Sequence, residues 1–148
     1  SQLSAFGGLE YTAAEQKYAE QIYETLFEPS LKLGDEKKIM PYKQSHTYGS
    51  TDVGDVSWLI PTAGIRTATW VPGTSAHSWQ AVAAGGMSIG LKGMKLAAKV
   101  LTASATKIYE NPEIIVDAKQ ELASRVGEDF KYEALLVDRD PPLDYRVN

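Results

Sequence analysis

The stretch that decides the predicted fold is Gly64-Ile-Arg-Thr-Ala-Thr-Trp-Val71. It is rich in β-branched and aromatic residues, which favour extended backbone on a half-buried sheet. Pro72 and Gly73 follow directly and would end a strand. A helix is predicted next, from Ser78 to about residue 106. Because strand, loop and helix follow one another, we expect an α/β fold.

The predicted helix after Ser78 carries an apolar stripe and an unusual number of glycines. Glycine in a helix interior costs about 1 kcal/mol relative to alanine, so close approach of another backbone would explain its presence. The glycines are Gly85, Gly86, Gly90 and Gly93. The stripe, which we expect to be buried, consists of Met87, Leu91, Met94, Ala98, Leu101 and Ala105.

Three further helices are predicted, over 12–27, 52–60 and 111–127. The first opens with the capping box Thr12-Ala-Ala-Glu15, and the second is expected to be capped by Asp52. The third follows the start signal Asn-Pro-Glu and ends at a glycine. Its expected buried side is made of Ile115, Ala118, Leu122 and Val126.

Composition places the chain among ordinary globular proteins. It has 148 residues, 43% of them hydrophobic and 23% charged, which predicts a single domain over 1–148 with a polar tail at 138–148. The absence of cysteine excludes disulfides, thiolate metal sites and cysteine nucleophiles. The net charge is −4 and the basic residues form no cluster, so no nucleic-acid partner is expected. No apolar run is long enough for a membrane helix, so we expect a cytoplasmic protein without a membrane partner.

His77 is the strongest candidate for a functional side chain. It lies in the loop that leaves the predicted strand, which is where ligands bind in α/β sheets. The start of the following helix disfavours the imidazolium form, and neutral imidazole is the form that binds metals. A lone histidine beside a helix start is nevertheless more often a solvated or capping group. His46, the second histidine, has no such context.

Two carboxylates, Asp52 and Asp55, would lie on one helix face. They could form an acid/base pair or supply metal ligands, although the stronger explanation is that they satisfy the free N–H groups of a helix start. A triad of Ser75, His77 and Asp52 can be drawn. It is set aside because no nucleophile-elbow motif supports it.

Two segments of the sequence, taken together, point to one protein family more specifically than either does alone. Gly49-Ser-Thr-Asp-Val-Gly-Asp-Val-Ser-Trp58 and Pro72-Gly-Thr-Ser-Ala-His-Ser-Trp-Gln80 resemble the C-terminal end of amidohydrolases of the aminoacylase/carboxypeptidase dinuclear metallopeptidase family. The resemblance implies the C-terminal half of a three-layer α/β/α catalytic domain of the phosphorylase/hydrolase-like zinc-peptidase type. It also implies a divalent metal, zinc or manganese, with two ions in the full-length family. By motif, His77 matches a metal ligand. The residues matching a loop near the substrate pocket are Gly49, Ser50, Thr51 and Asp52.

The resemblance implies a function for a longer protein. That protein would hydrolyse the amide bond of a small N-acyl amino acid or dipeptide such as p-aminobenzoyl-glutamate, and would form a homodimer. The family's His-x-Asp ligands and adjacent glutamates do not occur here, so no catalytic residue is expected in this chain. We therefore expect an inactive fragment of a protein about three times as long. The alternative is a non-catalytic oligomerisation or regulatory module.

Overall fold

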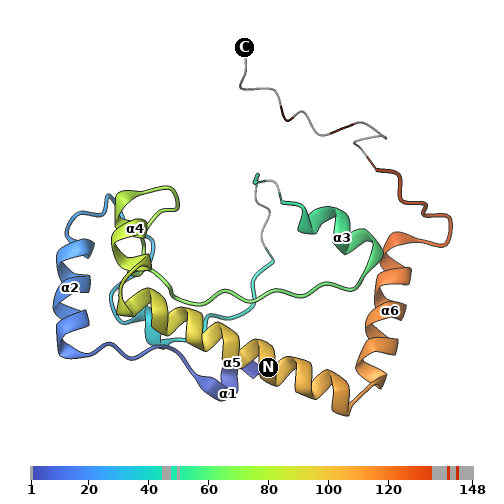
Figure 1. Ribbon diagram of the computed structural model, residues 1–148, viewed down its shortest axis with the longest axis horizontal. Helices are drawn as coiled ribbons and strands as arrows, with labels where there is room; N and C mark the ends of the chain where they lie inside the picture. The colour runs from blue at the N-terminus through green and yellow to red at the C-terminus, as the bar shows by residue number, and fades with distance from the viewer. Residues whose placement is uncertain (1, 45–47, 50, 135–139, 141–142, 144–148) are drawn as a thin grey trace. The chain divides into compact units, whose positions relative to one another are not determined.

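The computed structural model describes residues 2–44, 48–49, 51–134, 140 and 143 of the chain. The chain divides into two compact units. Unit 1 consists of Ser1–His46 and Gly64–Pro112, and unit 2 consists of Thr47–Ala63 and Glu113–Asn148. The elements of unit 1 are α1 (Gln2–Phe6), α2 (Ala13–Tyr23), the 3₁₀ helix η1 (Asp35–Lys37), α4 (Trp79–Gly85) and α5 (Ser88–Glu110) (Figure 1). Those of unit 2 are α3 (Val53–Leu59) and α6 (Glu113–Val126). Within the described residues, no helix is both long and apolar enough to cross a membrane.

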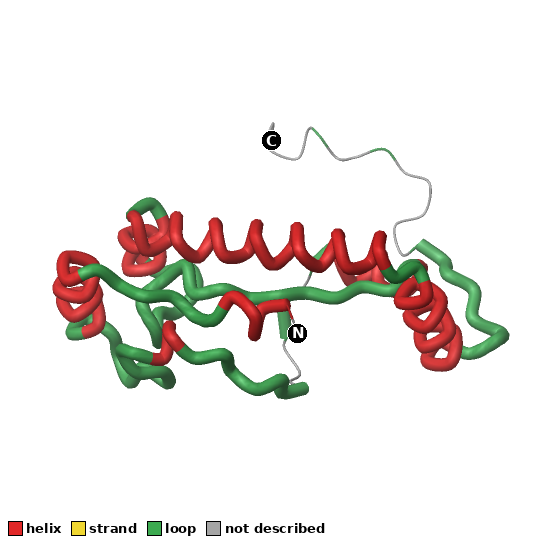
Figure 2. The backbone as a smooth tube through the Cα atoms, turned by 90° about the horizontal axis from the view of Figure 1, so that it is seen from below, coloured by secondary structure: helices red, strands yellow, loops and turns green. Residues whose placement is uncertain are grey.

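The predicted α/β fold, and with it the three-layer α/β/α domain, is wrong. Over the described ranges the chain forms helices and loops and no β-strand (Figure 2). The segment 64–71 is extended, as its composition predicts, but it pairs with no other strand and lies along α5 instead. Thr67 Oγ1 donates a hydrogen bond to the carbonyl oxygen of Gly93 at 3.0 Å. Side chains favour extended backbone locally, whereas a sheet also needs a neighbouring strand, which the segment itself does not encode.

The beginning of α2 matches its prediction, and its end does not. The backbone N–H of Glu15 donates to Thr12 Oγ1 at 3.3 Å, and that of Thr12 donates to the Glu15 carboxylate at 2.7 Å, which confirms the capping box. The helix ends at Tyr23 rather than at residue 27. The chain continues in tighter turns, because Thr25 donates both its N–H and its hydroxyl to the carbonyl oxygen of Ile22.

The single helix predicted from Ser78 onward is interrupted. α4 ends at Gly85, and α5 begins at Ser88. The two helices approach so closely that a Cβ atom at Gly90 would lie 2.1 Å from the carbonyl oxygen of Gly85. A Cβ at Gly93 would likewise lie 2.5 Å from the carbonyl oxygen of Ala68. Close backbone approach therefore explains both glycines, although the neighbour of Gly93 is an unpaired extended segment.

These glycines also decide which face of α5 is buried. The predicted stripe faces solvent, with Leu91 48% and Leu101 59% exposed. Because the close contacts require residues without side chains, α5 turns its glycine-bearing face inward and its larger apolar face outward. The buried residues of α5 are Ile89, Gly90, Gly93, Leu96 and Val100.

The apolar core lies entirely in unit 1 as far as the described residues show. Its larger cluster consists of Ala19, Ile22, Val71, Ala84 and Ile89, and its smaller cluster consists of Leu9, Leu96 and Val100. The extended segment contributes to the core through Val71, which is 1% exposed. It therefore anchors the loop that follows it.

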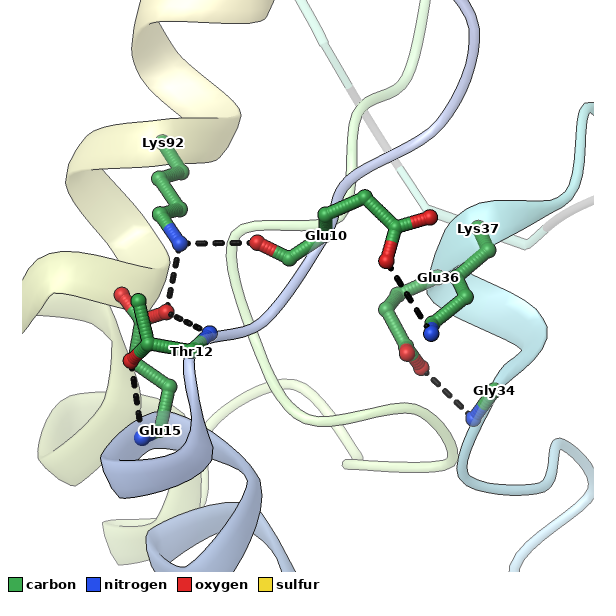
Figure 3. Close-up of polar contacts among 7 residues, drawn as sticks. All are labelled: Glu10, Thr12, Glu15, Gly34, Glu36, Lys37 and Lys92. Carbon is green, nitrogen blue, oxygen red and sulfur yellow. Dashed lines mark hydrogen bonds and ion pairs between the residues drawn. The ribbon is translucent and has the colours of Figure 1, made fainter.

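A polar network connects α2 to α5 (Figure 3). Lys92 Nζ lies 2.5 Å from Glu15 Oε2 and donates to the carbonyl oxygen of Glu10 at 2.7 Å. The Glu15 residue is only 8% exposed. Hydrogen bonds from Lys92 and then Ser88 lower the pKa of its carboxyl group to about 2. The same carboxylate thus caps α2 and binds the first turns of α5.

The helix α6 of unit 2 confirms its predicted boundaries but not its predicted burial. It begins at Glu113 and is followed by Gly127, whose φ of +85° suits a residue without a side chain. None of its residues is buried, and Ile115 is 43% exposed. The predicted tail 138–148 lies outside the described residues, except for Asp140 and Leu143.

Candidate functional site

His77 lies at the end of the loop that joins the extended segment to α4. Its φ of +58° is in the left-handed region, which is uncommon for residues other than glycine. The next residue, Ser78, holds the loop in place. Its hydroxyl donates to the carbonyl oxygen of Ser75 at 2.7 Å and accepts the N–H of Ala81 at 3.2 Å. The backbone around His77 is thus fixed on both sides, and the imidazole itself is exposed.

A hollow of about 440 Å³ opens beside His77. Its walls come from the end of the extended segment, the loop and the first turn of α4. The lining residues are Trp70, His77, Ser78, Trp79, Ala81 and Val82. The hollow therefore combines one imidazole, one hydroxyl and two indoles with a small apolar floor.

The residues of this hollow do not form a complete metal site. Neither a carboxylate nor a second histidine lines it. Elsewhere in the described chain, no group of three His, Cys, Asp or Glu side chains is arranged to hold a metal ion. Since a catalytic zinc ion takes about three protein ligands, the described residues fit only one corner of such a centre, the imidazole of His77.

The other predicted site residues belong to unit 2. Gly49, Thr51 and Asp52 are exposed, and Ser50 lies outside the described residues, as does His46. Thr51 Oγ1 accepts the N–H of Val53 at 3.3 Å, whereas Asp52 makes no side-chain cap. The predicted capping role of Asp52 is therefore wrong, and Thr51 takes it. The predicted role of these residues in binding substrate stays a prediction.

The structure adds no support for the two other catalytic groupings, the Asp52 and Asp55 pair and the possible triad. Desolvation, together with the nearby carboxylate of Asp55, raises the pKa of Tyr132. Asp55 is thus engaged within unit 2, which also contains Asp52. Ser75 and His77 belong to unit 1. The possible triad of Ser75, His77 and Asp52 therefore gains no support from the structure, because its residues belong to different units.

Unit 2 has a second hollow of about 500 Å³. The ring of Trp58 stacks on that of Phe130 at one side, with a centroid distance of 5.0 Å and an interplanar angle of 21°. The lining residues with polar ends are Trp58, Lys119 and Tyr132. The rest of the wall is aliphatic or aromatic. With no imidazole or carboxylate in its wall, it offers less chemistry than the hollow beside His77.

Sequence reasoning did not single out Trp70 and Trp79, which line the hollow beside His77. Both flank the loop that contains His77, and Trp79 belongs to the motif that carries the resemblance. Strand propensity explains Trp70 and the helix start explains Trp79, so neither residue was a candidate for a functional role. Their proximity to one histidine on both sides of a short loop was the available signal.

Comparisons with known proteins give one similar protein. No protein-family model matches the chain, and no solved structure matches it significantly. Among curated proteins, a p-aminobenzoyl-glutamate hydrolase subunit of Escherichia coli (strain K12) is 32% identical over an alignment of 144 residues that covers 80% of this chain. The chain is homologous to that hydrolase subunit. This confirms the predicted resemblance to amidohydrolases. The chain spans 30% of the length of the relative.

Proposed function

We propose that the chain is part of a metal-dependent amidohydrolase that cleaves the amide bond of a small N-acyl amino acid, with p-aminobenzoyl-glutamate as the substrate. The support is the similarity to a hydrolase subunit of that name. In this proposal His77 supplies one ligand to a zinc or manganese ion. The other ligands and the proton-transferring residue come from outside these 148 residues. The chain alone is therefore inactive.

The conformation of His77 is the observation that carries this proposal. A side chain in the left-handed region costs of order 1 kcal/mol, and glycine would occupy the position without that cost. Gly73, in the same loop, has a φ of +83° and follows that rule. A histidine held in such a conformation at the rim of a hollow supports the proposal that its imidazole has a role there.

The remaining parts of the proposal concern substrate and partners. Gly49, Ser50, Thr51 and Asp52 help to shape the substrate pocket of the whole protein. The relative is named as a subunit, which supports a partner subunit for this chain as well. We propose that the partner is a second copy, giving a homodimer.

Substitution of His77 in the full-length protein tests the metal role. His77→Asn and His77→Gly both tolerate the left-handed backbone, and glycine removes its strain. We expect each variant to lose at least one equivalent of bound metal, measured by inductively coupled plasma mass spectrometry, and most of its turnover. Thermal stability of the metal-free variants stays equal to that of the metal-free parent or rises. Unchanged metal content and turnover would contradict the proposal.

The isolated chain provides a second test. With added zinc or manganese, the purified 148-residue chain should not hydrolyse p-aminobenzoyl-glutamate. Measurable turnover that follows the chain through purification would show that the site is complete within it.

A second candidate function is that of a non-catalytic association module, and the outward face of α5 favours it. The face is apolar along the helix, and its larger members are Met87, Leu91, Met94 and Leu101, each about half exposed. Exposed apolar patches of this kind mark surfaces that contact other chains. The two candidates are distinguished by the His77 variants, since a pure association module would not depend on that imidazole.

A further inference from the structure

We propose that Trp70 and Trp79 form an aryl-binding wall beside His77, which selects N-aroyl over N-alkanoyl substrates. The inference rests on the proposed function and assigns it two specificity-determining residues. Both indoles line the same hollow as His77, one on each side of the loop.

Each indole is carried by a well-anchored part of unit 1. Trp70 is followed by the buried Val71, and a Cβ at Gly85 would lie 3.6 Å from its Nε1 atom, so its ring extends to the end of α4. Trp79 is the first residue of α4, directly after the Ser78 cap. On its inner side α4 is held by Ala81 and Ala84, which are 7% and 0% exposed. The wall is thus largely formed before a ligand arrives.

Both rings nevertheless leave much of their surface in water. Trp70 is 37% exposed and Trp79 is 60% exposed. Within the described part of the chain, neither ring stacks on another aromatic ring, whereas Trp58 stacks on Phe130. An aromatic ligand would cover apolar indole surface and gain the offset or edge-to-face ring contacts that the chain itself does not supply here.

The composition of the hollow decides which part of a substrate fits. No lysine, arginine, aspartate or glutamate lines it, so it offers no lysine or arginine to pair with the carboxylates of an N-acyl amino acid. Its volume of about 440 Å³ accommodates a benzene ring with its amide group. The uncharged aroyl part is therefore the part that binds against the tryptophans, with the amide directed at His77. A p-aminobenzoyl group is of this chemical class.

Direct binding can be followed on the full 148-residue chain. It has three tryptophans and hence three indole N–H signals in a ¹⁵N correlation spectrum. We expect N-benzoylglycine at millimolar concentration to shift the signals of Trp70 and Trp79 in a saturable way and to leave that of Trp58 unchanged. N-acetylglycine, which differs only in the acyl group, should shift none of them. No shift, or equal shifts of all three signals with both compounds, would overturn the proposal.

Kinetics of the full-length enzyme separate this inference from the metal role. In Trp70→Leu and Trp79→Leu, we expect kcat/KM for N-benzoyl substrates to fall roughly fivefold to tenfold relative to N-acetyl substrates, in line with the loss of one ring contact. Trp→Phe at the same positions should restore most of the preference, and metal content should stay unchanged. An unaltered benzoyl-to-acetyl ratio would refute the wall even if His77→Asn abolishes turnover. Normal turnover of His77→Asn would refute the metal role instead, whatever the ratio.

Discussion

Lys92 Nζ lies 2.5 Å from Glu15 Oε2, although the two residues are 77 positions apart in the sequence. The contact joins the second turn of α5 to the first turn of α2. Because Glu15 also caps α2 through Thr12, a single carboxylate stabilises both a helix end and the packing of two helices. The stability of unit 1 should therefore depend on the charge of this group.

The first prediction concerns the stability of unit 1 at low pH. The pKa of the Glu15 carboxyl is lowered from 4.5 to about 2 in the folded chain. A lowered folded-state pKa contributes stability that is present above 4.5 and is lost as the pH falls toward 2. Glu15→Gln should reduce the free energy of unfolding of unit 1 by about 1–3 kcal/mol at pH 7, since a hydrogen-bonded charge is removed.

Urea titrations at pH 7 and near pH 3 provide the measurement. The difference between the parent and Glu15→Gln should shrink at the lower pH. Glu10→Gln is the matched control, because Glu10 pairs with Lys37 at 3.0 Å on the surface and is 77% exposed. That substitution should change stability by less than about 1 kcal/mol. If Glu15→Gln lowered the free energy of unfolding equally at both pH values, the lowered pKa assigned to Glu15 would be contradicted.

The second prediction concerns the glycines of α5. In Gly93→Ala the new Cβ would lie 2.5 Å from the carbonyl oxygen of Ala68 and 2.7 Å from Thr69 Cγ2. Backbone must move to admit it, so we expect a loss of about 1–3 kcal/mol despite the better helix propensity of alanine. In Gly86→Ala the first contact is at 3.9 Å, and no loss is expected. Thermal melts of the two variants check this, and equal melting temperatures would show that the close approach is absent.

The third prediction concerns the contact between α2 and α4. The hydroxyl of Tyr18 donates to the carbonyl oxygen of Ala83 at 3.0 Å. Tyr18→Phe should destabilise unit 1 by about 0.5–1.5 kcal/mol, because one partly buried hydrogen bond is lost. Tyr109 is 88% exposed, so Tyr109→Phe serves as the control with no expected effect. Chemical denaturation of both variants distinguishes them, and identical midpoints would argue against the contact.

The fourth prediction concerns the outward face of α5. We expect the chain to self-associate as its concentration rises, as observed by sedimentation velocity, because Leu91 and Leu101 present apolar surface to water. The double variant Leu91→Gln, Leu101→Gln should shift the distribution toward monomer with a stability change within about 0.5 kcal/mol. Lys95→Gln, also exposed on α5, should leave association unchanged. A parent chain that stays monomeric at every concentration would exclude association through this face.

Local signals in the sequence predicted local structure well. The capping box at Thr12, the helix start at Ser78 and the glycine after α6 are all present. Each depends on hydrogen bonds or dihedral angles within a few residues, which the sequence encodes directly. The interruption between α4 and α5 is missed by the prediction, which places Gly85 and Gly86 inside one helix.

Non-local features could not be predicted in the same way. The segment 64–71 is extended as expected, but whether it meets a strand or a helix depends on residues far along the chain. The periodicity of α5 likewise identified an apolar stripe, while the glycines, and not the stripe, selected the buried face. For the site, the motif singled out His77. Its tryptophan neighbours became visible as a wall only once the loop and α4 were placed together.

The concentration of buried apolar side chains in unit 1 has a consequence for experiments on the whole chain. Neither α3 nor α6 contains a buried residue, so their backbone hydrogen bonds lack an apolar cover. Their amide protons should exchange with deuterated solvent well before those around Ile89, and a protease at low dose should cut between α6 and residue 134 first. Loss of circular dichroism on heating would then proceed in two steps, and its first midpoint would describe these helices rather than the candidate site.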